Sequence, residues 1–98
     1  MKTRYIVSYD ICDPRRLRLV HRTVRGFGEP LQYSVFQCDL SPSERILLIE
    51  ALAPIINHWE DQVMFIDLGP ADGRGTQTIE TLGRAISTAA SERVAFIV

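Results

Sequence analysis

Two stretches that are typical of β-strands are each followed by a helix start that contains proline. Residues 4–11 are rich in β-branched and aromatic side chains, and they predict a largely buried strand. Asp13 and Pro14 then fit a helix N-cap and the first helical position. Residues 31–40 predict a second strand with a bulge or two-sided burial near its middle, and the capping pattern at 41–44 predicts a second helix start. A strand and helix unit that occurs twice restricts the chain to folds in which helices pack on a sheet.

The rest of the chain completes a short series of elements. The second helix should end between residues 53 and 57, because Pro54 lacks a backbone donor. Residues 62–68 predict a third strand. Residues 76–82 favour a short strand, although their apolar positions also fit helical spacing, and residues 94–98 predict a terminal strand.

This order of elements predicts one α+β domain over residues 1–98, since two cores in so short a chain would each be too small. It is typical of a ferredoxin-like βαββαβ sandwich, an antiparallel sheet with two helices on one face, here followed by a C-terminal strand. We assign Tyr5, Val7, Val35 and Phe65 to the other, open face of the sheet. A second copy of the chain around a twofold axis is the most economical cover for such an apolar face.

Composition narrows the class of protein. With 46% hydrophobic and 23% charged residues, the chain has enough apolar surface to form a core, which argues against intrinsic disorder. No apolar run approaches the ~20 residues of a membrane span, and no signal-peptide pattern is present, so we expect a cytoplasmic protein with no membrane partner. Cys12 and Cys38 are too few for a disulfide framework, and we expect two reduced, mostly buried thiols.

Positive charge is concentrated in the first part of the chain. Residues 1–38 carry seven Lys and Arg against three acids, whereas the remainder carries four Arg against nine acids. In the helix expected over residues 14–25, arginines recur at helical spacing opposite an apolar stripe. These arginines are Arg15, Arg18, Arg22 and Arg25, with Arg16 alongside. A solvated helix face is the alternative interpretation, but no acid between residues 14 and 28 would pair with the arginines, which favours a polyanion site.

Asp10, at the end of the first strand, is the candidate for chemistry. Mg²⁺ prefers oxygen ligands and is usually bound by one or two carboxylates together with water and substrate phosphate. A single Asp would suffice if a twofold axis brought its symmetry mate nearby. The alternative is that Asp10 only accepts backbone N–H bonds at the strand end. His21 and His58 lack partners at catalytic spacing, and we expect both on the surface.

Four short motifs follow one another in the first part of the chain. They are Tyr9-Asp10-Ile11, the Arg-rich helix after Asp13, Gly26-Phe27-Gly28 and Gln32-Tyr33-Ser34-Val35-Phe36. Together they resemble the CRISPR-associated small endonuclease family of spacer adaptation. The similarity covers residues 3–69 and continues more loosely to the C-terminus. The joint occurrence of Tyr-Asp-Ile and Gln-Tyr-Ser-Val-Phe is what makes the resemblance specific.

The resemblance implies a ferredoxin-like homodimer in a prokaryotic cytoplasm that binds the spacer integrase, bridges two integrase dimers and holds duplex DNA. Some family members are metal-dependent nucleases on RNA or DNA. It implies that Asp10 of each subunit binds Mg²⁺ or Mn²⁺, with Tyr9 beside it in the catalytic site. Phe36 would lie near the active cleft and contact nucleic acid. The resemblance also implies phosphate contacts from three arginines, Arg15, Arg16 and Arg18. The C-terminal strand would pair with the sheet of the other subunit.

Three functional hypotheses remain open. The first is metal-dependent phosphodiester hydrolysis, and the second is a non-catalytic DNA-binding scaffold that bridges the spacer integrase. The third, a small-molecule regulatory module, is disfavoured because a small ligand rarely needs five positive charges on one helix. Cys12 stands where the family commonly has a small hydroxyl residue, and a thiol there would either weaken a polar network near the metal or be neutral.

Overall fold

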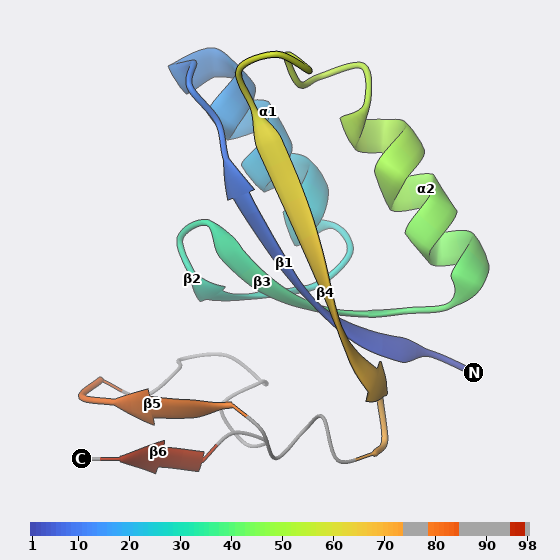
Figure 1. Cartoon of the computed structure of the whole chain (residues 1–98), viewed down its shortest axis with the longest axis vertical. Helices are drawn as coiled ribbons and strands as arrows, with labels where there is room; N and C mark the ends of the chain where they lie inside the picture. Colours follow the sequence, from blue (N-terminus) through green and yellow to red (C-terminus); the bar gives the residue numbers. More distant parts are fainter. Residues whose placement is uncertain (74–78, 85–94, 98) are drawn as a thin grey trace.

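The computed structural model describes residues 1–73, 79–84 and 95–97 (Figure 1). Its elements in chain order are β1 (Thr3–Asp10), α1 (Pro14–Arg25), β2 (Glu29–Gln32), β3 (Val35–Leu40), α2 (Pro42–Leu52), β4 (Gln62–Pro70), β5 (Glu80–Leu82) and β6 (Ala95–Ile97). The elements from β1 to β4 have the predicted βαββαβ order.

β1 is a central strand of a four-stranded sheet with the order β2-β3-β1-β4. It pairs antiparallel with both β3 and β4, and β2 pairs antiparallel with β3. Val20 and Val24 of α1 and Leu48 and Leu52 of α2 belong to the same buried cluster as Val7 of β1. Both helices therefore cover one face of the sheet, and the predicted ferredoxin-like sandwich is confirmed.

Both predicted helix starts are present. The Asp13 side chain accepts a hydrogen bond from the backbone N–H of Arg16, at 2.9 Å, and Pro14 occupies the first turn of α1. At α2, Ser41 and Glu44 form a reciprocal capping box, in which each side chain accepts from the backbone N–H of the other. Helix α2 ends at Leu52, slightly before the predicted range.

The predicted single strand over residues 31–40 is two strands. β2 and β3 are joined by a tight turn at Tyr33 and Ser34, and β2 begins two residues before the predicted stretch, at Glu29. The predicted two-sided burial is present in β3, where the consecutive residues Phe36, Gln37 and Cys38 are all buried. The hairpin turn itself has no clear sequence signal, because it lacks the Asn-Gly or Asp-Gly pair that usually marks a short hairpin.

The assignment of sheet faces is wrong for three of the four residues named. Val7 is fully buried and lies opposite Phe36 of β3 and Phe65 of β4, on the face that the helices cover. Tyr5 packs against the same core, whereas Val35 lies opposite Ser8 on the other face. Strand alternation divides these residues into two sets, but both sets are apolar, so alternation alone does not show which one faces the helices.

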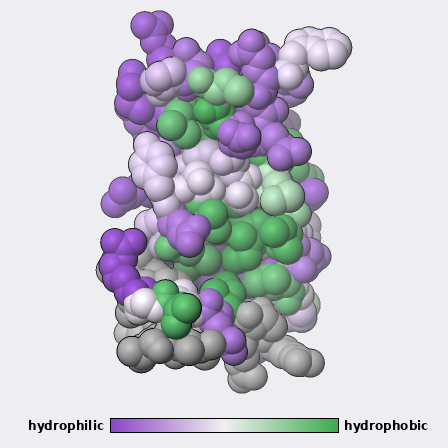
Figure 2. Space-filling model, turned by 60° about the vertical axis from the view of Figure 1, so that its left-hand side comes forward, coloured by the Kyte–Doolittle hydropathy of each residue, from purple (hydrophilic) through white to green (hydrophobic). Residues whose placement is uncertain are grey.

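The open face of the sheet is nevertheless apolar in part. It carries Ile6 of β1, which lies between Gln37 and Ile66, and the adjacent Ser8, which lies opposite Met64. Met64 and Ile66 are 46% and 41% exposed. Figure 2 shows one face of the molecule on which hydrophobic side chains gather next to hydrophilic ones.

β5 and β6 pair parallel in a separate two-stranded sheet. β5 covers the end of the predicted strand 76–82, and β6 lies within the predicted strand 94–98. The rest of those predictions falls partly on residues 74–78, 85–94 and 98, outside the described residues. Within the part of the chain that the structure describes, no helix is long and apolar enough to cross a membrane. Pairing of the C-terminal strand with a second subunit stays a prediction.

Candidate nucleic-acid interface

Helix α1 presents arginine on the side opposite its buried stripe. Val20 and Val24 are fully buried under the helix. The exposed arginines are those predicted from helical spacing, namely Arg15, Arg18, Arg22 and Arg25. Among the described residues none of these four forms an ion pair with a carboxylate. We call these four arginines the α1 ridge, and their charge is available to an external anion.

Arg16 differs from the α1 ridge because it is already paired within the chain. Its Nε donates to Asp61 Oδ2 at 2.8 Å, and its Nη2 donates to Glu60 Oε1 at 3.0 Å. These acids lie about one half of the chain away, so a search for neighbours within the helix misses them. A phosphate at Arg16 would compete with two carboxylates, which makes Arg16 a weaker candidate for nucleic-acid contact than the α1 ridge.

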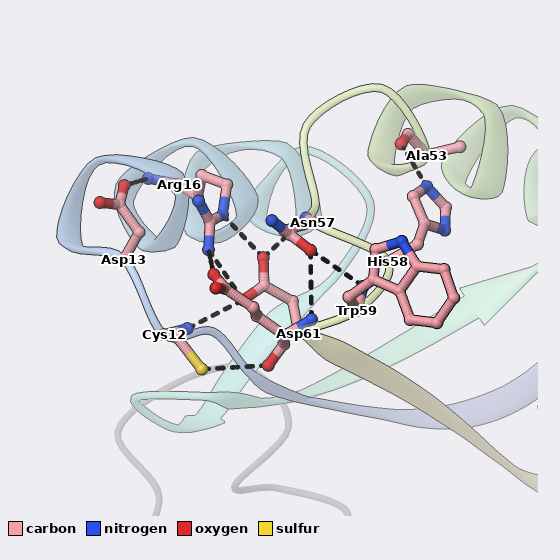
Figure 3. A network of polar contacts seen from close by, with 9 residues as sticks. Cys12, Asp13, Arg16, Ala53, Asn57, His58, Trp59 and Asp61 are labelled. Carbon is pink, nitrogen blue, oxygen red and sulfur yellow. Dashed lines mark hydrogen bonds and ion pairs between the residues drawn. The ribbon is translucent and has the colours of Figure 1, made fainter.

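Asp61 is the centre of a polar network that the sequence does not reveal (Figure 3). Its side chain has no exposed area, and its carboxylate accepts from the backbone N–H groups of Cys12, at 2.9 Å, and Asn57, at 2.8 Å. These bonds and the Arg16 guanidinium hold the pKa of Asp61 well below its usual range, the hydrogen bond from Arg16 being the largest cause. Asp61 therefore ties the loop after β1 to the loop before β4.

Cys12 takes part in the same connection (Figure 3). Its Sγ donates to the backbone oxygen of Glu60 at 3.0 Å, and the residue is exposed, contrary to the expectation of two buried thiols. Cys38 is buried as expected, and burial raises the pKa of its thiol to about 12. The Cys12 thiol thus contributes to the network that holds the end of β1.

Asp10 lies at the edge of the region that this network fixes. It is the last residue of β1, lies opposite Gln62 of β4, and is exposed. No described residue forms a hydrogen bond or ion pair with its carboxylate, so the bonding to backbone N–H groups that we considered as an alternative is not seen. The carboxylate oxygens are available to a ligand from outside the chain.

The residues around Asp10 fit a divalent cation only as part of a shared site. No group of three or more His, Cys, Asp or Glu side chains that could hold a metal occurs in residues 1–73, 79–84 or 95–97. Mg²⁺ is usually bound by one or two carboxylates, and water and substrate phosphate oxygens complete its ligand shell. Asp10 is thus one possible oxygen ligand, and the described part of a single chain adds no ligand cluster around it.

Tyr9 and Asp10 are neighbours in sequence but point to opposite faces of the sheet. The Tyr9 ring is buried, and its hydroxyl lies 2.8 Å from His21 Nδ1 and 3.1 Å from the carbonyl oxygen of Tyr33. Burial is the main cause that raises the pKa of Tyr9 to about 12, so the phenol stays protonated. The structure does not bring Tyr9 beside the Asp10 carboxylate, where the resemblance implied it.

Phe36 is also a core residue in this structure. It is fully buried, with its ring centroid 6.2 Å from that of Tyr9. The nucleic-acid contact that the resemblance implied for Phe36 has no exposed surface on which to form, because α1 covers this side of the sheet. Phe36 lies in β3 directly after the hairpin turn, opposite the fully buried Val7 of β1.

His21 is not the surface residue that we expected. Its ring is partly buried, stacks on Tyr33 at a centroid distance of 4.9 Å and 18° between planes, and meets Phe36 edge to face at 5.3 Å. Helical spacing could have indicated this position, because His21 follows Leu17 by four residues and so lies on the same side of the helix as that apolar residue. His58 is exposed as expected, and its Nε2 donates to the carbonyl oxygen of Ala53 at 2.9 Å (Figure 3).

Comparison with known proteins supports one family. The family model described as CRISPR associated protein Cas2 matches residues 1–74. The chain is 43% identical over 94 residues to CRISPR-associated endoribonuclease Cas2 1 of Rhodospirillum rubrum, covering 96% of this chain and 89% of that protein. It is 50% identical over 72 residues to CRISPR-associated endoribonuclease Cas2 of Geobacter sulfurreducens, covering 74% of this chain and 76% of that protein.

Solved structures agree with this assignment. Streptococcus pyogenes Cas2, crystallised at pH 6.5, is similar with a TM-score of 0.63 and 32% identity, covering 67% of this chain and 86% of that one. A further Cas2 crystal structure matches with a TM-score of 0.73 over 91% of this chain and 95% of that one, and at 24% identity it bears on the fold alone. With the family model matching most of its length, the chain belongs to the CRISPR-associated protein Cas2 family.

Proposed function

We propose that this protein acts in CRISPR adaptation as a homodimer that binds nucleic acid and hydrolyses phosphodiester bonds with Mg²⁺ or Mn²⁺. The observation that carries the proposal is the position of Asp10. Its carboxylate is exposed and has no partner among the described residues, and α1 with its unpaired arginines starts four residues later. The names of the relatives in R. rubrum and G. sulfurreducens, both endoribonucleases, support hydrolysis.

The α1 ridge supplies the binding. Arginines that contact phosphates release counterions, and this gives affinity that falls steeply with salt and carries little sequence information. Arg22 and Arg25 lie in the last turn of α1, where their charge is also compatible with the helix dipole. Binding by the α1 ridge would therefore act on RNA and DNA alike.

The residues near the cleavage position have separable roles. Asp10 of each chain would hold the cation, which when bound lowers the pKa of a water molecule and polarises a phosphoryl oxygen. The α1 ridge would hold the phosphates on either side of the reacting one. Asp61 fixes the loop between Asp10 and α1, and so sets the spacing between the metal ligand and the arginines. Tyr9 would act as a positioning residue and not as a catalytic one. Its protonated phenol lies on the face of the sheet opposite to the Asp10 carboxylate and so does not touch the reacting atoms.

The dimer is supported by the open sheet face. Met64 and Ile66 remain about half exposed on it, and a second copy would remove such apolar surface from water. A twofold axis would also bring a second Asp10 carboxylate to the cation, since the described part of one chain holds no group of three or more metal-ligating side chains. Membership of a CRISPR-associated family supports the spacer integrase as a further partner and the prokaryotic cytoplasm as the location.

The test compares wild type with Asp10→Asn on labelled RNA and duplex DNA, with Mg²⁺, with Mn²⁺ and with chelator. We expect the variant to lose hydrolysis by at least about 100-fold, because an amide is a poor ligand for a hard cation. Glu50→Gln is the matched control, since Glu50 is exposed on α2 away from Asp10. Both variants should remain dimers in sedimentation experiments. Metal-dependent cleavage by Asp10→Asn at the wild-type rate would reject the catalytic role.

A second function, a non-catalytic scaffold beside the integrase, is favoured by the absence of a complete metal cluster in the described part of one chain. It predicts that Asp10→Asn leaves spacer acquisition in cells unchanged. Replacing Arg18 and Arg22 together with alanine should still reduce acquisition, because the scaffold needs to hold duplex DNA. If Asp10→Asn abolishes spacer acquisition and no added metal restores it, the result would favour the nuclease.

A further inference from the structure

Tyr33 is an exposed aromatic residue that the rest of the chain holds in place. It lies in the turn between β2 and β3, and 63% of its surface is exposed. One side of its ring stacks on His21, with centroids 4.9 Å apart and planes within 18° of parallel. A ring that is stacked on one side and still largely exposed offers its remaining surface to a ligand.

The support behind Tyr33 extends into the core. The carbonyl oxygen of Tyr33 only accepts, so the Tyr9 hydroxyl donates to it, at 3.1 Å. That leaves the Tyr9 oxygen to accept from His21 Nδ1, 2.8 Å away. His21 is also held edge to face against the buried ring of Phe36. The backbone and the ring of Tyr33 are therefore both fixed, and binding there requires little further ordering.

Cationic side chains flank this stack. Arg18 and Arg25 precede and follow His21 by three and four residues on α1, and such positions lie on the same side of a helix, with Cβ atoms about 5–6 Å apart. Both arginines are exposed, and neither is paired with a carboxylate of the described chain. The His21 ring on which Tyr33 stacks is thus flanked on α1 by two available positive charges.

We propose that Tyr33 stacks an unpaired nucleobase of single-stranded nucleic acid, whose phosphates are held by Arg18 and Arg25. This inference rests on the proposed function and adds to it a site for a base. Every nucleobase has a π-face, so stacking would be tolerant of sequence, whereas bases inside an intact duplex are already stacked on one another. The site would favour single-stranded ends or frayed junctions over continuous duplex.

Trp59 provides a contrast within the same molecule. It is 97% exposed, but no aromatic ring among the described residues stacks on it, and the neighbouring Glu60 is acidic and 56% exposed in its side chain. An exposed aromatic residue with no supporting ring beside a negative charge is a poor site for a nucleotide. Trp59→Ala is therefore the matched control for Tyr33→Ala.

The experiment measures binding of labelled single-stranded oligothymidylate at low salt with chelator, beside an abasic oligonucleotide of the same length and a blunt duplex. Tyr33→Ala should weaken oligothymidylate binding roughly 5- to 100-fold. Abasic and duplex binding should stay within about twofold of wild type, since phosphate contacts are kept. Tyr33→Phe should bind as wild type does, because the ring is retained, and Trp59→Ala should also be unchanged.

Two results would overturn the inference while leaving the proposed function intact. One is that Tyr33→Ala binds oligothymidylate as wild type does. The other is that it loses abasic and duplex binding by the same factor, which would assign the effect to the fold. If the wild-type protein binds none of the three probes, the proposed function fails, and the stacking site fails with it.

Discussion

Helices α1 and α2 cover the same face of the sheet, yet their outer surfaces differ in kind. The outer side of α1 carries the α1 ridge, four exposed arginines with no carboxylate partner in the described chain. The outer side of α2 carries Ile46, Leu47 and Ile49, which are 54%, 56% and 37% exposed. Equivalent positions in the fold therefore carry surfaces of different chemistry. An arginine surface suits a polyanion, and an apolar surface does not.

The helices also differ in how their first turns are held. α1 begins in a network that reaches across the molecule, because Arg16 and the preceding loop both bind Asp61 (Figure 3). α2 begins with a local capping box between Ser41 and Glu44. The long-range connection fixes α1 relative to the end of β1 and hence to Asp10. The local cap stabilises α2 without fixing any predicted site residue.

The largest expected effect comes from reversing charge on α1. We expect Arg18→Glu combined with Arg22→Glu to weaken duplex binding on the order of 100-fold at low salt, and to lower the salt slope by about two. The measurement is a fluorescence titration at several salt concentrations. Ile46→Glu combined with Leu47→Glu adds the same number of acids to α2 and should leave binding within a few fold. Equal losses from both pairs would contradict the difference between the helices.

The next effect concerns Asp61 and pH. The pKa of Asp61 is lowered in the folded protein from an ordinary value of 3.8, so its contribution to stability is present above about pH 4 and is lost as the pH falls further. We expect Asp61→Asn to lower the Tm by several degrees near neutral pH, and the difference from wild type to narrow as the pH falls below about 4.

Asp67→Asn is the control for that prediction, since Asp67 is exposed and accepts from the backbone N–H of Gly69 at 2.7 Å without an arginine partner. Its Tm should change less than that of Asp61→Asn. A Tm difference for Asp61→Asn that stays constant from about pH 7 to about pH 2 would show that the carboxylate charge does not stabilise the network.

The smallest effect is expected at the start of α2. Ser41→Ala removes one side of the capping box and should lower the free energy of unfolding by about 1 kcal/mol. Nucleic-acid affinity should not change, because α2 carries none of the α1 ridge. Ser43→Ala, at an exposed position two residues after Ser41, should cost less. Denaturant unfolding measures the first quantity, and weakened nucleic-acid binding by Ser41→Ala would argue against the separation of roles.

The order of elements could be predicted because it depends on local signals. Asp13, Pro14 and the Ser41 capping box are short-range features, and they mark both helix starts correctly. The arginine side of α1 follows from helical spacing in the same way. The hairpin at Tyr33 and Ser34 lacked such a signal, so two strands were predicted as one.

The side of the sheet and the long-range partners could not be predicted locally. Ile6 and Val7 are adjacent and apolar, and only tertiary packing decides that Val7 faces the helices. Asp61 pairs with Arg16 across 45 positions of sequence, a separation at which composition gives no information. The partly buried position of His21 depends on Tyr33 folding back over α1, which again requires the complete fold.

The proposed function requires that Asp10 of two copies share one divalent cation beside the α1 ridges. Mn²⁺ binding to the purified protein, followed by electron paramagnetic resonance, tests it most directly. The account predicts one tightly bound ion for every two chains, and no tight binding by Asp10→Asn. One ion for each chain, or undiminished binding by the variant, would contradict it.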